Sequence, residues 1–401
     1  MNNWGWNAVM NRPSKIAFTN PRAKHGFGIR SCSITGLGAY LPPSVLTNSE
    51  LAKKVDVSEE WILTRTGIRE RRIAEEECTS DLGAQAALRA MTSAGVTANQ
   101  IDLIITATNT PDMAFPATAC LIQSKIGVRR APSFDIKAAG SGFLHALEVG
   151  QQFVASYTCD TVLVIGAEKL SAMVDWKDPN TCLLFGDGAG AAILQSLPGE
   201  RGLLTTCLGC QGGKAELLFM PGGGSRQPAS IQSVEARQHF LRMDGRDMFK
   251  QAIHVMHAAA LEALGRCGLN IAEIDCIIPH QANQRIISAL MERLGAREHQ
   301  LFTNLERYGN TSGASIPIAL TEAVSSGVIR SGDIVLLIAF GAGLTWGAAV
   351  IEWAATMSSP LPSQAEKQKV FPKPEIKRVR IAGGKPSGIP RQDESKPEEV
   401  L

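Results

Sequence analysis

Two segments of the chain carry side chains that could stabilise negative charge on an oxygen. His280 closes the apolar run CIIPH, and Asn310 lies in the segment RYGNTSGAS (307–315). A neutral imidazole and an amide both donate hydrogen bonds, the property needed for carbanion or oxyanion chemistry. Each residue alone is weak evidence, because a lone histidine is usually structural and asparagine is common in turns. Taken together they indicate a candidate site.

A third segment, FDIKAAGSGFLHAL (134–147), has the pattern of a strand end, a turn and a buried helix. A nucleophile at such a helix start would be activated by the positive end of the helix dipole, and free backbone N–H groups could hold an oxyanion. Gly140 stands there and supplies no reactive side chain. On the sequence alone, the favoured interpretation is that Gly140 meets the backbone requirement of a tight turn. Ser141 is rotated by about 100° along the helix, so we expect it to point elsewhere and to act as the N-cap.

An internal repeat relates these three segments. The aligned pairs, all at an offset of 173 residues, are 87–110 with 260–283, 160–168 with 333–341, and the turn at Gly140 with the turn ending at Gly313. A constant offset over three separate stretches predicts a duplicated α/β unit. Two such halves would bring their equivalent turns towards a pseudo-twofold axis. We therefore expect the turn at 140, the strand end at 280 and the turn at 310 to meet.

The organisation of the chain follows from the alternation of helical and β-rich segments, which predicts an α/β fold with parallel sheets. We expect the two duplicated halves to span residues 31–200 and 201–356, the second half carrying His280 and Asn310. Residues 1–30 are predicted to form an N-terminal extension. The tail, residues 357–401, is rich in proline and lysine and is predicted to be disordered.

Composition excludes several classes of function. The 40 Lys and Arg residues nearly balance the 38 Asp and Glu residues, so nucleic acid is not expected as a partner. No apolar run reaches the ~18–20 residues of a membrane span, and residues 1–30 lack the apolar core of a secretory signal. The nine cysteines are therefore expected to be reduced in a soluble, cytoplasmic protein. CLGC (207–210) has no second ligand pair at zinc-binding spacing, so no metal is expected.

Five motifs in the same order resemble the β-ketoacyl-acyl-carrier-protein synthase III enzymes, and the resemblance runs from about Ile34 to Trp353. The motifs are WILTRTGIRERR (61–72), FGDGAGAAIL (185–194), PHQANQRI (279–286), RYGNTSGAS and FGAGLTWGAA (340–349). The resemblance implies a thiolase fold, in which the two halves pack as five αβαβα layers. It also implies the initiating reaction of type II fatty acid synthesis, in which a short acyl-CoA such as acetyl-CoA condenses with malonyl-acyl carrier protein and carbon dioxide leaves. The product is 3-oxoacyl-acyl carrier protein, no cofactor is used besides the acyl-CoA substrate, and the enzyme is a homodimer.

The resemblance also assigns roles to residues. The family's catalytic histidine and asparagine match His280 and Asn310, while its nucleophilic cysteine falls at Gly140. The remaining matches are the oxyanion-hole N–H groups of Gly140 and Ala342; Trp61 and Arg65 for the nucleotide of CoA; Gly245, Phe249 and Asn283 along the pantetheine tunnel; Phe115 as a limit on acyl length across the dimer interface; and Lys250 and Arg285 for docking of the carrier protein. An arginine that covers the adenine in the family is replaced near Pro179. From the residues alone, Trp61 could instead be a core aromatic, and the charged residues could be ordinary surface charges.

Gly140 divides the reaction into two parts. Acyl transfer needs a thiolate, whereas decarboxylation needs only hydrogen-bond donors aimed at the thioester oxygen. The sequence therefore predicts impaired acyl transfer with decarboxylation retained. Three interpretations stay open: a working condensing enzyme in which a single-base change replaced cysteine, a malonyl-thioester decarboxylase, and a non-catalytic partner of an intact paralogue. The presence of both His280 and Asn310 argues against the third.

Overall fold

Two mixed β-sheets form the centre of the fold in the computed structural model, which describes residues 30–197 and 202–354. The strands of the first sheet, in spatial order, are β1 (Ser33–Tyr40), β7 (Gly188–Gln195), β6 (Thr161–Glu168), β4 (Leu103–Ala107) and β5 (Ser133–Ile136). Those of the second are β11 (Cys276–Pro279), β12 (Ile334–Gly341), β13 (Thr345–Glu352) and β8 (Gly202–Cys210).

The prediction of parallel sheets is correct only for part of each sheet. β4 runs parallel to both of its neighbours, and β11 runs parallel to β12. The other pairings, β1 with β7, β6 with β7, β12 with β13 and β13 with β8, are antiparallel. A short loop, residues 342–344, joins β12 to β13, and such a connection can only return the chain antiparallel.

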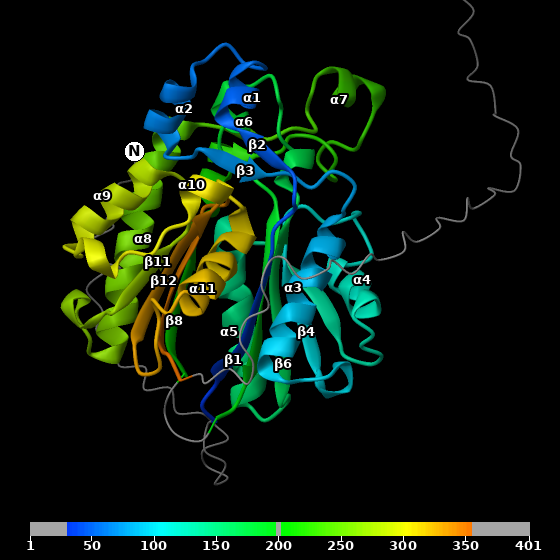
Figure 1. The fold of residues 1–401 in the computed structure, drawn as a ribbon. Helices are drawn as coiled ribbons and strands as arrows, with labels where there is room; N and C mark the ends of the chain where they lie inside the picture. The colour runs from blue at the N-terminus through cyan, green and yellow to red at the C-terminus, as the bar shows by residue number, and fades with distance from the viewer. Residues whose placement is uncertain (1–29, 198–201, 355–401) are drawn as a thin grey trace, which may run out of the picture. The chain divides into compact units, whose positions relative to one another are not determined.

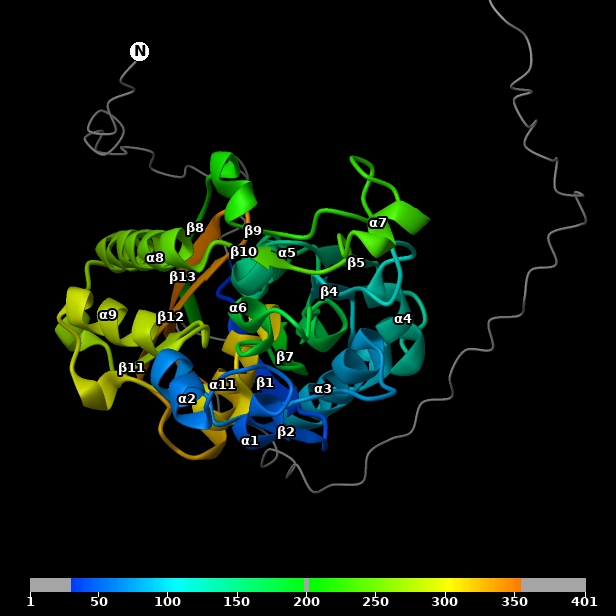
Figure 2. The same cartoon turned by 90° about the horizontal axis from the view of Figure 1, so that it is seen from above.

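Helices form three further layers around the sheets, which confirms the five-layered αβαβα arrangement (Figures 1 and 2). The outer layers contain α3 (Thr79–Ala94) with α4 (Thr118–Lys125) on the first sheet, and α8 (Gly245–Cys267) with α9 (Gln284–Leu294) on the second. Between the sheets lie α5 (Gly142–Ala155) and α11 (Ser315–Ser325). Because the central helices face two sheets, most of their side chains are buried, including Phe143 and Ile316.

The repeat is visible in the bounds of the elements. An offset of 173 residues carries β6 onto β12, the 3-10 turn η3 (Ala98–Gln100) onto η7 (Ile271–Glu273), and η4 (Ala139–Ser141) onto η9 (Ser312–Ala314). It also carries the first residue of α5 onto the first residue of α11. The backbone repeats as well, because Ala139 and Ser312 both adopt a positive φ, 46° and 48°. The structure therefore confirms the duplication.

Smaller elements surround the ends of the strands. They are β2 (Val45–Thr47), α1 (Asn48–Ala52), α2 (Glu59–Thr66), β3 (Glu70–Arg72), η5 (Leu170–Ala172), α6 (Pro179–Cys182), η6 (Gly212–Leu217), β9 (Leu218–Phe219), α7 (Ile231–Glu235), β10 (Arg242–Met243), η8 (Glu298–Gln300) and α10 (Leu305–Tyr308). Of these, α2, α6, β9 and β10 contribute residues to the pocket described below.

The predicted division of the chain remains a prediction. All the described residues fall within one compact unit, and the expected boundary near residue 200 coincides with the undescribed residues 198–201. Both the N-terminal extension and the predicted disordered tail lie outside the described residues. Within the described ranges, none of the helices combines the length and apolar character needed to cross a bilayer.

Candidate active site

A pocket of about 670 Å³ opens at the carboxyl ends of the central strands, and its lining includes Gly140, His280 and Asn310. As the repeat predicts, the two equivalent turns and the end of β11 meet there. The pocket extends outwards past side chains of α2, α6, α8 and α9 to the surface. It is therefore a depression with polar groups at its base and a lining drawn from both halves of the chain.

His280 and Asn310 form a buried hydrogen-bonded pair. Nε2 of His280 lies 3.1 Å from Oδ1 of Asn310, and the Ser312 backbone N–H donates to the same Oδ1 at 2.8 Å. Because a backbone N–H can only donate, the atom it contacts must be the amide oxygen, and Nε2 must carry the hydrogen of the neutral imidazole. Within the described residues, the NH2 group of Asn310 makes no hydrogen bond, so it can donate to a ligand.

The surrounding backbone holds both side chains in place. The His280 N–H donates to Ile338 O at 2.7 Å, which extends the pairing of β11 with β12 by one residue. Asn310 lies in a parallel bridge with Phe185, in which its N–H donates to Leu184 O at 2.8 Å and its carbonyl accepts from Gly186 N at 3.0 Å. The catalytic candidates are therefore positioned by sheet-like pairing rather than by free loops.

Gln281, next to His280, connects the two sides of the pair. Its side-chain oxygen accepts hydrogen bonds from the backbone N–H groups of Asn304 and Leu305, both at 3.1 Å, and from the hydroxyl of Thr303 at 2.6 Å. These residues lead through α10 to Asn310. Gln281 therefore ties the strand end that carries the histidine to the segment that carries the asparagine.

Burial keeps His280 neutral. Its side chain is almost fully buried, and removal from water lowers its pKa to about 4, although the hydrogen bond with Asn310 raises it in part. At neutral pH the imidazole is therefore an uncharged donor through Nε2. The ring also packs against Phe340, with a distance of 5.3 Å between centroids. An uncharged donor is better suited to stabilising an enolate oxygen than to transferring a proton.

Gly140 is not explained by the conformation of its turn, contrary to the interpretation favoured from the sequence. The left-handed residue of this turn is Ala139, whereas Gly140 lies outside the positive-φ region. Glycine is instead required by space. A β-carbon at 140 would overlap Cε1 of His280 and the carbonyl oxygen of Phe340, and it would lie 2.7 Å from Nδ1 of His280. The His280 ring thus occupies the volume next to the Gly140 backbone.

Ser141 faces away from the pocket, as expected. Its hydroxyl lies within hydrogen-bond distance of Ala138 O, at 2.8 Å, and of the Thr345 hydroxyl, at 2.9 Å. Although Ser141 occupies the N-cap position of α5, its side chain makes no capping hydrogen bond, so the expected capping role is wrong. The hydroxyl instead joins the turn to the start of β13. Ser141 is consequently not placed to replace a missing nucleophile.

The two proposed oxyanion donors, the N–H groups of Gly140 and Ala342, belong to residues that both line the pocket. Gly341 passes so close to the turn that a β-carbon on it would lie 2.6 Å from Gly140 N. The repeat provides an internal comparison, because Glu168 occupies the position equivalent to Gly341. Its carboxylate accepts a hydrogen bond of 3.4 Å from Gly313 N, the equivalent of Gly140 N. The equivalent amide in the other half thus donates to a carboxyl oxygen.

Residues assigned to substrate binding line the outer part of the pocket. Trp61, Arg65, Gly245, Phe249 and Asn283 all contribute to it. Trp61 is 42% exposed, so the alternative interpretation as a core aromatic is wrong, and the Arg65 guanidinium lies 5.5 Å from its ring centre. Both residues present surface on which a planar group can stack.

Asn283 has a structural role that the sequence did not indicate. Its side-chain oxygen caps α9 by accepting from Arg285 N at 2.9 Å, and its amide donates to Arg65 O at 3.1 Å. This second bond joins α9 to the end of α2. The sequence likewise does not indicate the roles of Phe185, Phe340 and Glu168, because each contributes through backbone pairing or burial that no short motif reveals.

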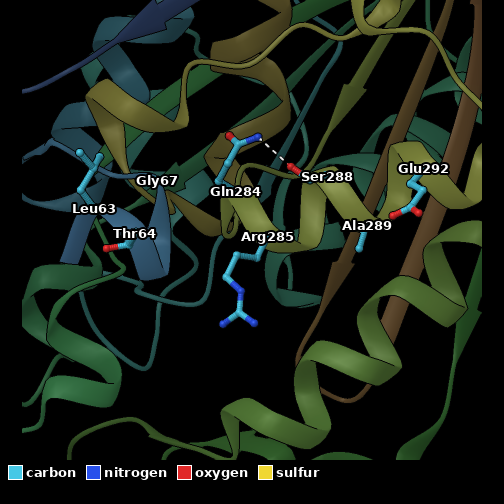
Figure 3. A pocket seen from close by; sticks show the side chains of 8 residues that line it. All are labelled: Leu63, Thr64, Gly67, Gln284, Arg285, Ser288, Ala289 and Glu292. Carbon is cyan, nitrogen blue, oxygen red and sulfur yellow. Dashed lines mark hydrogen bonds between the residues drawn. The ribbon is translucent and has the colours of Figure 1, made fainter. Parts of the chain in front are cut away.

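Basic side chains stand at the entrance. Lys250 and Arg285 both line the pocket, and Arg285 lies 5.6 Å over the ring of Phe249. Arg285 also lines a second, shallower pocket between α2 and α9 (Figure 3). In Figure 3 its side chain points away from α9, while Gln284 bonds to Ser288 along the helix. Arg285 therefore places a positive charge at the mouth of the pocket, over the Phe249 ring.

Phe115 is the one assigned residue that the structure leaves outside the pocket. Its side chain is 85% exposed, on the loop that precedes α4. Nothing in the single chain covers this ring among the described residues. Its assigned position across a dimer interface remains a prediction.

Comparison with known proteins places this geometry in a family. Two family models match, 3-oxoacyl-[acyl-carrier-protein] synthase III over residues 134–212 and its C-terminal region over residues 264–353. The β-ketoacyl-[acyl-carrier-protein] synthase III of Caldanaerobacter subterraneus is 50% identical over 325 residues, 81% of this chain and 98% of that protein. The enzyme of the same name from Symbiobacterium thermophilum is 51% identical over 326 residues, 81% of this chain and 99% of that protein.

Solved structures agree. The crystal structure of 3-oxoacyl-[acyl-carrier-protein] synthase III from Aquifex aeolicus has a TM-score of 0.75 and 45% identity, and the match covers 80% of this chain and all of that one. The corresponding protein of Pseudomonas aeruginosa has a TM-score of 0.76 and 36% identity, with 83% of this chain and all of that one covered. This chain therefore belongs to the β-ketoacyl-acyl-carrier-protein synthase III family, the acyltransferases that initiate type II fatty acid synthesis.

Proposed function

We propose that this protein decarboxylates malonyl-acyl carrier protein and has lost efficient condensation. The observation that carries the proposal is an intact, neutral His280–Asn310 pair beside Gly140. The His280 ring fills the space that a side chain at position 140 would need. The reacting thioester oxygen would take a hydrogen bond from the free NH2 group of Asn310 and one from His280 Nε2–H, which would leave Asn310 Oδ1 or share its hydrogen with it. Backbone N–H groups of Gly140 and Ala342 are the second set of donors available in the pocket.

The chemistry balances without a nucleophile. The bond between the malonyl carboxylate and the methylene carbon breaks, its electron pair enters the enolate, and carbon dioxide leaves. In the complete family reaction the enolate attacks an acyl-enzyme, which cannot form without a thiolate. Here the enolate carbon takes a proton from water and becomes an acetyl thioester. The product would be acetyl-acyl carrier protein.

Carrier protein and CoA are the partners that the pocket best supports. An acidic carrier protein would meet Lys250 and Arg285 at the entrance, where a local positive field can steer association. Trp61 and Arg65 offer a stacking surface for the adenine of CoA, although the resemblance implies that the family's adenine-covering arginine is replaced near Pro179. We further propose that the protein acts in the cytoplasm and uses no cofactor.

Purified protein should release carbon dioxide from malonyl-acyl carrier protein and should form no acyl-enzyme. The expected result is accumulation of acetyl-acyl carrier protein by mass spectrometry, with no mass increase of the enzyme after incubation with acetyl-CoA. The exposed cysteines provide a control. Chemical blocking of Cys78, Cys120 and Cys210 should leave the decarboxylation rate unchanged. An acetyl adduct on the enzyme, or malonyl-carrier protein left intact, would contradict the proposal.

We also propose that the chain forms a homodimer through the edge of the first sheet. Strand β5 is an edge strand, and Asp135 on it caps α4 by accepting from Thr118 N at 2.7 Å. The loop just before α4 carries Phe115, 85% exposed, and Met113, 41% exposed. An unpaired strand edge beside large exposed apolar side chains is a typical interface.

Replacement of Phe115 by aspartate should shift the protein towards monomer, because a charge would be buried at the proposed interface. Sedimentation equilibrium of both proteins at several concentrations measures the effect, and we expect dissociation to become at least about tenfold easier, a loss of ~1.4 kcal/mol. Val328→Asp is the matched control, since Val328 is also an exposed apolar residue but lies after α11. A monomeric wild-type protein, or equal association of all three proteins, would refute the dimer.

A further inference from the structure

A fully buried carboxylate lies behind the two turns of the active site. Glu168 ends β6 and has no exposed surface. Its oxygens accept hydrogen bonds from Asn109 N at 3.0 Å, from Asn109 Nδ2 at 2.7 Å and from the Thr110 hydroxyl at 2.8 Å. Burial raises the pKa of Glu168, and these hydrogen bonds oppose the rise. A buried carboxylate surrounded only by donors is arranged to bind them as an acceptor.

The same carboxylate reaches both turns. It contacts the Gly313 turn directly, since Gly313 N donates to Oε1 at 3.4 Å. It reaches the Gly140 turn through Asn109, whose NH2 group binds the carboxylate while its Oδ1 accepts from Ala139 N at 3.2 Å. Asn109 thus bridges the carboxylate and the residue that precedes Gly140.

These contacts fall where the turns need support. Ala139 and Ser312 both hold left-handed backbone conformations that residues with a β-carbon rarely adopt. The N–H of Ala139 itself donates to Asn109, and the residue after Ser312, Gly313, donates to Glu168. Such conformations persist only where the surroundings fix them. Ala139 carries the amide clamped by Asn109, and the next amide along the chain is Gly140 N, the proposed oxyanion donor.

We propose that Glu168 and Asn109 are positioning residues that clamp the two turns and thereby aim the Gly140 N–H at the thioester oxygen. The inference rests on the proposed function for its kinetic consequence, although the clamp itself does not depend on the reaction. Neither side chain lines the pocket, so neither is expected to touch the substrate. Their loss should consequently slow the chemical step and leave substrate binding unchanged.

Two substitutions separate the arms of the clamp. Asn109→Ala removes only the bridge to Ala139 and leaves Glu168 bonded to Thr110 and Gly313. Glu168→Gln replaces an acceptor with an amide whose NH2 group faces other donors, so it should loosen both turns. Because a misplacement of about 1 Å can cost two orders of magnitude in rate, we expect kcat for decarboxylation to fall about tenfold in Asn109→Ala and further in Glu168→Gln. KM should stay within about twofold of the wild-type value in both.

Asp112→Asn is the matched control. Asp112 also accepts hydrogen bonds with a partly buried carboxylate, from Ser80 N at 2.8 Å and the Ser80 hydroxyl at 2.6 Å, but contacts neither turn. Its kcat should equal that of the wild type. A merely structural role of the clamp would instead lower the amount of folded enzyme without changing kcat per folded active site.

Hydrogen exchange of the full chain, followed by mass spectrometry, tests the clamp independently of activity. Asn109→Ala should speed exchange in peptides covering Ala139 and Gly140 but not in those covering Gly313, whereas Glu168→Gln should speed exchange in both. Failure of the wild type to decarboxylate would refute the proposed function while exchange still decides the clamp. Unchanged exchange in Asn109→Ala, or a fall in kcat/KM that resides in KM alone, would overturn the inference. If Glu168→Gln does not fold, Asn109→Ala alone decides whether the side-chain link to Ala139 positions the Gly140 N–H, by exchange and by kcat.

Discussion

Substitution of His280 by alanine should lower the rate of malonyl-acyl carrier protein decarboxylation by about a hundredfold or more, the loss typical of one oxyanion donor. The reason is that Nε2–H is one of two side-chain donors available to the developing enolate oxygen, and its burial makes the lost interaction strong. Asn310→Ala should have an effect of the same order. Asn310→Asp should be worse, because it replaces the donor with a negative charge beside the enolate. Carbon dioxide release under single-turnover conditions measures all three.

The control is His299→Ala, which removes an exposed histidine that does not line the pocket. Its rate should match that of the wild type. The double variant His280→Ala/Asn310→Ala should lose less than the product of the single losses, since the two donors act on one oxygen. A His280→Ala rate equal to wild type would mean that the observed carbon dioxide comes from uncatalysed decarboxylation, and the proposed function would fall.

The pH dependence checks the protonation state that this role requires. Because the pKa of His280 is lowered to about 4, the imidazole stays neutral and the decarboxylation rate should be level between about pH 5 and 8. An ordinary histidine would produce an inflection near pH 6.5. The lowered pKa also makes the contribution of His280 to folding stability depend on pH. The unfolded chain binds a proton at this histidine below about pH 6.5, whereas the folded chain does so only near pH 4. Stability from this residue is therefore lost as the pH falls between those values.

The sequence predicts the meeting of the site segments because the repeat converts linear spacing into symmetry. His280, Asn310 and the Gly140 turn are more than 100 residues apart at the extremes, yet a constant offset of 173 places their strand ends at one edge. The pattern that follows Gly140 also predicts a buried helix there, which is one of the two central helices, since helices packed between two sheets are apolar on nearly all sides. These features depend on patterns that extend over many residues.

Contacts between single atoms could not be predicted in this way. The sequence favours a turn glycine at Gly140, whereas the left-handed residue is its neighbour Ala139. The volume beside Gly140 is filled by His280, 140 residues away in the chain, and no local pattern carries that information. Glu168 likewise reads as one acidic residue after an apolar strand, and its link to both turns emerges only from the packing of the halves. The spacing of residues in the sequence therefore predicts where helices and strands lie, but only the packed structure shows whether a side chain would fit at position 140.

The close packing around Gly140 predicts that adding a β-carbon there strongly affects both activity and stability. Gly140→Ala should lower the decarboxylation rate about tenfold or more and reduce the free energy of unfolding by about 1–3 kcal/mol, the usual cost of overpacking a filled site. The β-carbon would overlap the His280 ring and the Phe340 carbonyl oxygen. The backbone oxygen has little freedom to move, so the ring must turn away from Asn310. Carbon dioxide release and thermal unfolding measure the two consequences.

Gly140→Cys adds the same β-carbon together with a thiol, so it should not simply restore condensation. We expect slow, incomplete acetylation by acetyl-CoA and a decarboxylation rate below that of the wild type, because the ring must withdraw before the sulfur has room. Gly265→Ala is the matched control: Gly265 lies in α8 with open space around its would-be β-carbon, and alanine there should stabilise the helix by up to about 1 kcal/mol. Rapid, complete acetylation of Gly140→Cys with undiminished decarboxylation would show that the site still fits a cysteine. In that case the thiol at position 140 is the single group that an otherwise intact condensing enzyme lacks. The expected result means instead that neighbouring residues fill the space that a side chain at position 140 would need.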